Sequence, residues 1–121
     1  MDNSLFPVGE YLERFNGITG NSLPVGMIYQ STGLQIHILK RHPHLLGYLS
    51  KIPEIILSPD YIGIHPNEPN SIELVKRYAE NIQIAIKLDI DKNYLYVASL
   101  YEIKEARLKK RIHSGRLKKV Y

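Results

Sequence analysis

Residues 82–103 run IQIAIKLDIDKNYLYVASLYEI, and this stretch predicts the centre of the fold. Its first part alternates strictly between apolar and other side chains, and period two with β-branched residues is strong evidence for a strand. The apolar positions are Ile82, Ile84, Ile86, Leu88 and Ile90. Residues 91–93 predict a tight turn, and residues 94–103 predict the partner strand. One face of that partner is expected to carry Leu95, Val97, Ser99, Tyr101 and Ile103.

Outward from this hairpin, residues 71–78 predict a third strand, and residues 25–30 and 59–64 predict short ones. A helix is expected from Ser31 or Thr32 to the break at Pro43. A second helix then begins at Pro43 and is expected to end at Pro53, while residues 54–58 fit either a helix or a strand. Residues 104–112 favour a basic C-terminal helix. The predicted fold is α+β, with N-terminal helices packed on a three- or four-stranded antiparallel sheet.

A length of 121 residues predicts one domain. We expect residues 1–24 to form an N-terminal extension that packs lightly on the body, with a short helix from Pro7 through Phe15. Residues 25–116 form the expected domain, and residues 117–121 a loose basic tail.

The net charge of +4 is unevenly distributed, because residues 104–121 hold eight basic side chains and one acidic one. Such a segment is either a solvated terminus or an arm that binds phosphate. The absence of cysteine excludes disulfides and thiolate chemistry. No apolar run can span a bilayer and no signal peptide precedes the domain, so we expect a cytoplasmic protein without membrane contact.

Histidine and cationic residues are concentrated in residues 37–44, HILKRHPH. His37 and Arg41 are four residues apart and share a helix face, with Lys40 beside them and His42 and His44 at the proline break. Imidazoles near cations can transfer protons at neutral pH, and cations can hold a phosphate. The spacing matches no zinc motif, and Lys40 and Arg41 would repel a cation, so no metal or cofactor is expected. The alternative is an ordinary polar helix surface.

The sheet and the C-terminal helix add further candidates. Ser99 is either a core hydroxyl or a donor to phosphate, and Lys87 or Lys76 is a strand-borne cation. Tyr101 either stacks on a base or simply covers the sheet. Arg107, Lys110 and Arg111 are candidates for binding a nucleic-acid backbone.

Several strings, in this order, resemble the phage nuclease families related to barnase, EndoU, the tRNA-cutting colicins and RelE, which share the BECR fold. They are YQSTGLQIHILKRHP (29–43), IPEIILSPDYIG (52–63), SIELVK (71–76) and the two long strands that end near Ser99. The resemblance covers residues 25–116. It implies helices on one face of a small antiparallel sheet.

The resemblance also implies a metal-independent ribonuclease in which the RNA 2′-hydroxyl attacks the neighbouring phosphate and leaves a 2′,3′-cyclic phosphate. His37 and His42 would then be base and acid in unassigned order, with Ser99 and Arg41 as further catalytic candidates. Substrate would be held by the remaining cations and by aromatic or histidine side chains, namely Lys40, His44, Lys87, Tyr101, Arg107, Lys110 and Arg111. The expected partners are RNA and an antitoxin or immunity protein, and the oligomeric state stays open. The alternatives are a non-catalytic RNA- or protein-binding domain, and a small protein that blocks a host protein.

Overall fold

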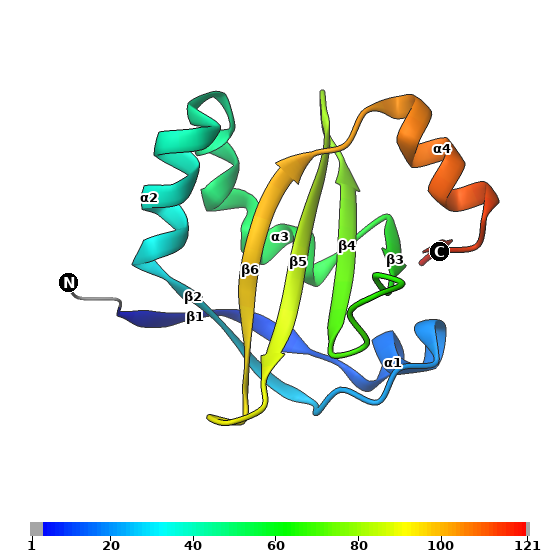
Figure 1. The fold of residues 1–121 in the computed structure, drawn as a ribbon, viewed down its shortest axis with the longest axis horizontal. Helices are drawn as coiled ribbons and strands as arrows, with labels where there is room; N and C mark the ends of the chain where they lie inside the picture. The colour runs from blue at the N-terminus through cyan, green and yellow to red at the C-terminus, as the bar shows by residue number, and fades with distance from the viewer. Residues whose placement is uncertain (1–3, 121) are drawn as a thin grey trace.

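A computed structural model describes residues 4–120 as a mixed α+β fold built on one sheet (Figure 1). In chain order the elements are β1 (Leu5–Tyr11), α1 (Glu13–Thr19), β2 (Gly26–Ser31), α2 (Thr32–Arg41), the 3-10 helix η1 (Pro43–Lys51), α3 (Ile52–Leu57), β3 (Tyr61–Gly63), β4 (Ser71–Arg77), β5 (Asn81–Asp89), β6 (Tyr94–Glu102), α4 (Glu105–His113) and β7 (Leu117–Lys119).

The sheet has seven strands within residues 4–120, in the order β1-β2-β6-β5-β4-β3-β7. All neighbouring strands are antiparallel except β2 and β6, which pair in parallel. The predicted α+β class is therefore confirmed, whereas a three- or four-stranded, wholly antiparallel sheet is wrong in detail. The prediction lacked two strands: β1, whose residues were expected to form a helix, and β7, whose three residues are too few for a period-two pattern to be recognised.

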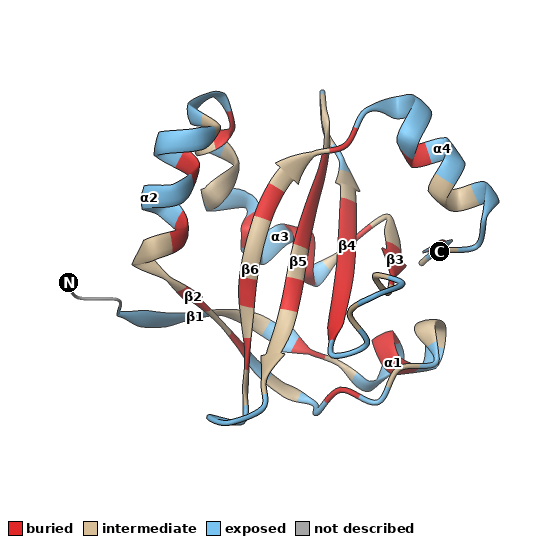
Figure 2. Ribbon diagram, viewed as in Figure 1, coloured by how far each residue is buried: buried red, intermediate tan, exposed pale blue. Residues whose placement is uncertain are grey.

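The predicted hairpin is the centre of the sheet. The side chains of Ile82, Ile84 and Ile86 are fully buried in the main core, on the face that packs against the helices. Figure 1 shows α3 behind the central strands, and Figure 2 shows the buried residues following β4, β5 and β6. The expected turn is present, and Asn93 takes a left-handed φ of 56° there. Asparagine tolerates this backbone region better than most residues, which explains a tight turn without glycine.

A β-bulge reverses the expected orientation of the second half of β6. Ile86 pairs with Val97, but the next residue back, Ala85, pairs with Ser99, so Ala98 is the extra residue. Beyond the bulge, Leu100 faces the core, while Ser99 and Tyr101 lie on the opposite face. The expectation that Val97, Ser99 and Tyr101 share an apolar face is therefore wrong, because one inserted residue shifts the period-two pattern.

The N-terminal segment is part of the body of the fold. Residues 5–11 form a strand instead of the expected helix, and β1 pairs with β2 along its length. Tyr11 and Phe15 are fully buried and contact each other edge to face, with ring centroids 5.4 Å apart. The expectation of light packing is thus wrong, since this segment contributes two large aromatic side chains to the core. Residues 1–3 of the expected extension lie outside the described residues.

Two further local expectations are also corrected. Pro53 does not end the second helix, because η1 passes directly into α3 and Pro53 occupies the first turn of α3, where a missing N–H costs nothing. The expected loose tail contributes β7, which pairs with β3, so residues 117–119 are held in the sheet. Tyr121 lies outside the described residues. The basic helix is confirmed as α4.

Candidate functional site

The face of the sheet opposite the main core carries mostly polar and aromatic side chains, and we call it the open face. Where α4 packs against this face, Val75 is buried in a second, smaller apolar cluster with Ile103, Leu108 and Leu117. Figure 1 shows α2 and α4 on either side of strands β6, β5 and β4, with α3 behind them. The strand register places on this face Ser71, Glu73, Gln83, Ala85, Lys87, Tyr96, Ser99 and Tyr101.

His37 lies at one side of the open face, where two parallel strands diverge. β2 and β6 pair at Ile28 with Leu95 and at Tyr29 with Tyr96, after which β2 separates from β6 and stays paired with β1 until α2 begins. Residues at this divergence form a shallow hollow that we call the histidine hollow, lined by Ser31, Gly33, Leu34, His37, Tyr96, Val97 and Ala98. The predicted candidate His37 is therefore exposed and faces the sheet beside the β6 bulge.

The other two candidate histidines form a row with His37. The ring centroids of His37 and His42 are 6.4 Å apart, and those of His42 and His44 are 6.3 Å apart. His42 is half-buried at the C-cap of α2, and Lys40 and Arg41 are exposed in the last turn of that helix. Across residues 4–120, no three His, Cys, Asp or Glu side chains are grouped closely enough to hold a metal ion.

Lys87 extends the candidate site across β5. Its ammonium is 3.2 Å from a carboxylate oxygen of Glu68, and both side chains are more than one-third exposed. The two residues line a second hollow with Tyr96, which also lines the histidine hollow, so Tyr96 lies between His37 and Lys87. Lys76, the alternative strand-borne cation, lies on the other face and donates to the carbonyl oxygen of Ser58 at 2.8 Å.

Ser99 lies on the open face next to the bulge, opposite Ala85, and is half-buried. Its neighbour Ala98 lines the histidine hollow. The core-hydroxyl interpretation of Ser99 is therefore wrong.

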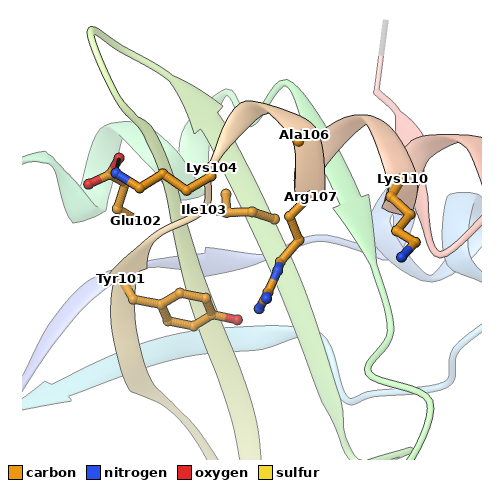
Figure 3. A pocket seen from close by; sticks show the side chains of 7 residues that line it. All are labelled: Tyr101, Glu102, Ile103, Lys104, Ala106, Arg107 and Lys110. Carbon is orange, nitrogen blue, oxygen red and sulfur yellow. Dashed lines mark hydrogen bonds and ion pairs between the residues drawn. The ribbon is translucent and has the colours of Figure 1, made fainter.

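At the other side of the open face, α4 and the sheet enclose a basic groove, which we call the α4 groove. It consists of two adjoining hollows that share Arg107 and Lys110. Tyr101, Ile103 and Lys104 line the first hollow, and Arg111 and Arg116 line the second. In Figure 3 the guanidinium of Arg107 points toward the hydroxyl of Tyr101. The predicted candidates Tyr101, Arg107, Lys110 and Arg111 thus come together, although the lining of the histidine hollow contains no residue of α4.

Beneath the α4 groove lies a buried polar network that the sequence did not reveal. Arg116 donates from Nε and Nη2 to the two carboxylate oxygens of Glu73, at 2.9 and 2.8 Å. Gln83 Nε2 donates to Glu73 at 2.9 Å and to the hydroxyl of Tyr101, while Gln83 Oε1 accepts from Arg111 at 2.9 Å. The hydrogen bonds to Glu73 raise the pKa of the Arg116 guanidinium above its already high ordinary value. This group is therefore a permanent cation that neutralises a buried carboxylate.

A signal for this network was present in the sequence. Glu73, Gln83 and Tyr101 are all at positions that face away from the main core on three adjacent strands. Finding them would have required the strand register and the bulge, neither of which the alternation alone supplies.

The comparisons with known proteins agree with this arrangement. The model of the family described as phage-Barnase-EndoU-ColicinE5/D-RelE like nuclease3 matches residues 7–110, most of the chain. The chain belongs to this nuclease family. The suspected resemblance is thereby confirmed, and the match includes most of β1, which the expected domain of residues 25–116 left out. Neither the curated proteins nor the solved structures gave a significant match.

Membership in this nuclease family gives the geometry a chemical context. The histidine hollow contains the imidazole of His37, a group able to transfer a proton, and the α4 groove contains cations of the kind that bind phosphate. Within residues 4–120, no helix is long and apolar enough to cross a membrane.

Proposed function

We propose that this nuclease-family domain is a metal-independent endoribonuclease. It cleaves RNA by attack of the 2′-hydroxyl on the adjacent phosphate, which leaves a 2′,3′-cyclic phosphate and a free 5′-hydroxyl. The observation that carries the proposal is the position of His37 in a hollow on the open face, with Lys87 on the far side of Tyr96. Family membership supplies the phosphodiester substrate.

The proposed reaction needs a base for the 2′-hydroxyl proton and an acid for the leaving 5′-oxygen. His37 and His42 take these roles in unassigned order, because their rings are 6.4 Å apart and a phosphate group can lie between them. Arg41 and Lys40 supply positive charge beside them, with His44 as a further contact. Lys87 and Ser99 complete the site from the sheet, since both lie on the open face.

The bound RNA strand is proposed to continue from the histidines across the open face toward α4. Tyr96 and Tyr101 both present aromatic rings there, and base stacking on such rings tolerates any sequence. Arg107, Lys110 and Arg111 then contact the backbone of the strand. We further propose that the protein acts in the cytoplasm as a toxin-like product of a phage or mobile element, restrained by an antitoxin or immunity protein.

Cleavage of RNA in excess EDTA tests the proposal directly. The expected products carry a 2′,3′-cyclic phosphate, which mass spectrometry distinguishes from a linear phosphate. His37→Ala should reduce the cleavage rate about 10²-fold or more, the usual contribution of one general acid–base group. His113→Ala is the matched control, because His113 is exposed at the end of α4 and lines neither hollow described for His37 or Lys87.

Three outcomes would contradict this function. Dependence of cleavage on a divalent cation would refute the metal-independent mechanism, and equal rates for His37→Ala and the wild type would refute the role of His37. Binding of RNA without any cleavage would support the alternative, a non-catalytic RNA-binding domain on the same fold.

A further inference from the structure

The α4 groove is lined by side chains that donate hydrogen bonds. Arg107, Lys110 and Arg111 are three and four residues apart, so they share one face of α4. Arginine and lysine have donors and no acceptor, and they line the groove together with the hydroxyl-bearing Tyr101. Figure 3 shows Arg107 and Lys110 extending from α4 on the side of Tyr101. A ligand that fills this groove must supply acceptors.

Gln83 determines the direction in which Tyr101 donates. Its side chain is fully buried, and the chemistry of its partners orients the amide: the carboxylate of Glu73 only accepts, and Arg111 only donates. Gln83 Nε2 therefore donates to both Glu73 and the Tyr101 oxygen. Because that oxygen accepts from Gln83, the proton of the Tyr101 hydroxyl is available for a different acceptor.

The side-chain amide of Gln83 also leaves the positive charge of the α4 groove intact. Arg116 neutralises Glu73, so this buried carboxylate does not offset a second cation. Arg111 is held through Gln83 Oε1, a neutral acceptor that fixes its position without compensating its charge. The acidic side chain that lines the groove, Glu102, is already paired with Lys104 at 2.9 Å. The groove thus combines a fixed neutral donor with three cations, while its two neighbouring carboxylates, Glu73 and Glu102, are paired with Arg116 and Lys104.

We propose that the α4 groove binds a phosphate of the nucleic-acid strand other than the one that is cleaved, with Gln83 as the positioning residue. Tyr101, Arg107, Lys110 and Arg111 contact the phosphate oxygens, and Gln83 positions Tyr101 and Arg111 without reducing the charge of Arg111. The identity of the strand rests on the proposed function. The match to the nuclease family ends at residue 110, so Arg111 and Arg116 lie beyond it.

Binding of an uncleavable strand separates this site from catalysis. The probe is a fluorescent 2′-O-methyl RNA of about ten nucleotides, within the range that small single-strand-binding domains cover. Its affinity for the full chain is measured by fluorescence anisotropy over a series of salt concentrations. Since 2′-O-methyl groups prevent the proposed attack, the measurement requires no activity.

Three variants have distinct expected signatures. Arg107→Gln removes one phosphate contact, so the slope of log affinity against log salt should become shallower by about 1. Tyr101→Phe removes a neutral donor, so affinity should fall about threefold to tenfold with the slope unchanged. Gln83→Glu cancels the charge of Arg111 and turns the Tyr101 hydroxyl inward, so affinity should fall about tenfold and the slope should become shallower by about 1. Asn93→Asp, the same amide-to-acid change at the β5–β6 turn, should leave the slope unchanged.

Wild-type affinity in Tyr101→Phe would overturn the proposed orientation of the donor, even if Arg107→Gln weakened binding. If Gln83→Glu and Asn93→Asp changed the RNA affinity and its salt slope equally, added negative charge alone would explain the result. That outcome would also overturn the proposal. If Gln83→Glu does not fold, the results for Arg107→Gln and Tyr101→Phe still decide whether the proposed phosphate site stands. If inorganic phosphate saturated the α4 groove without displacing the RNA probe, the assignment of this groove to a phosphate of an RNA strand would be overturned. Probe binding that requires the groove, in a protein that cleaves no RNA, would support this site and refute the proposed function alone.

Discussion

Removal of the Arg116 side chain should destabilise the fold through the carboxylate that it leaves behind. The Glu73 side chain is 3% exposed and receives two hydrogen bonds from the guanidinium, at 2.9 and 2.8 Å. Breaking a buried ion pair on one side costs about 3–5 kcal/mol. The Arg116 side chain is 20% exposed, so water can replace part of it, and Gln83 still donates to Glu73. The expected loss for Arg116→Ala is therefore about 2–3 kcal/mol, at or just below the low end of that range.

Urea unfolding at neutral pH measures this loss. With a slope of about 1.5 kcal/mol per M for a small domain, the midpoint should fall by about 1.3–2 M. The matched control is Lys104→Ala, which breaks an ion pair whose lysine is 81% exposed and should cost no more than about 0.5 kcal/mol. The double variant Arg116→Met with Glu73→Leu removes both charges and should recover most of the stability.

Two outcomes would refute this reasoning. A midpoint for Arg116→Ala within about 0.3 M of the wild type would mean that Glu73 is not a buried charge that depends on its partner. A double variant no more stable than Arg116→Ala would mean that Arg116 stabilises the fold by packing instead of by neutralising Glu73.

Gly63→Ala should destabilise the fold by about 3 kcal/mol or more in the same urea assay, since a Cβ there would lie 2.0 Å from the carbonyl oxygen of Arg116 and only backbone movement could relieve the clash. Glu105→Gln should lower stability near neutral pH. The hydrogen bond from Asn81 and then that from Arg77 lower the pKa of Glu105, so its contribution is present above the unfolded value of about 4.3 and is lost as pH falls through the lower folded value. Urea midpoints over a pH series should therefore converge for wild type and variant in acid.

Each of these two predictions has a clear counter-result. Gly17→Ala is the control for Gly63→Ala, because nothing lies within 4 Å of a Cβ at Gly17 in α1, and it should not destabilise the protein. A similar loss in both variants would attribute the effect at Gly63 to something other than the clash with the Arg116 carbonyl. A stability difference for Glu105→Gln that does not change with pH would contradict an ionised, hydrogen-bonded Glu105.

The central strands were predictable because their side chains are sorted by face. Ile82, Ile84 and Ile86 are fully buried, so the alternation along β5 records burial on one face directly. The helix break at Pro43 was also predictable, since proline restricts the preceding residue, and His42 has ψ 59° outside the helical region. Local rules succeed at these positions because tertiary packing reinforces them.

The N-terminal strand could not be predicted by the same rules. β1 contains Pro7 and Gly9, which disfavour a central strand, and most of its residues are exposed. It is stable as an edge strand because β2 pairs with it and because Gly9 allows close packing, since a Cβ there would lie 2.8 Å from Ile56. Strand pairing and close contacts of this kind join residues far apart in the sequence, so local residue patterns do not predict them.

The candidate site shows the same division between local and long-range information. Residue types alone indicated the cations of α4 and the histidines of residues 37–44, because the chemistry of these side chains does not depend on where they lie. Glu73 and Gln83 were missed because an acid and an amide within strands have no function until register aligns them with Tyr101. The Ala98 bulge places Tyr101 on the same face as Gln83, and without it Tyr101 would point into the main core. One inserted residue in β6 therefore makes both Ser99 and Tyr101 available on the open face, and the proposed chemistry and the proposed phosphate site both depend on it.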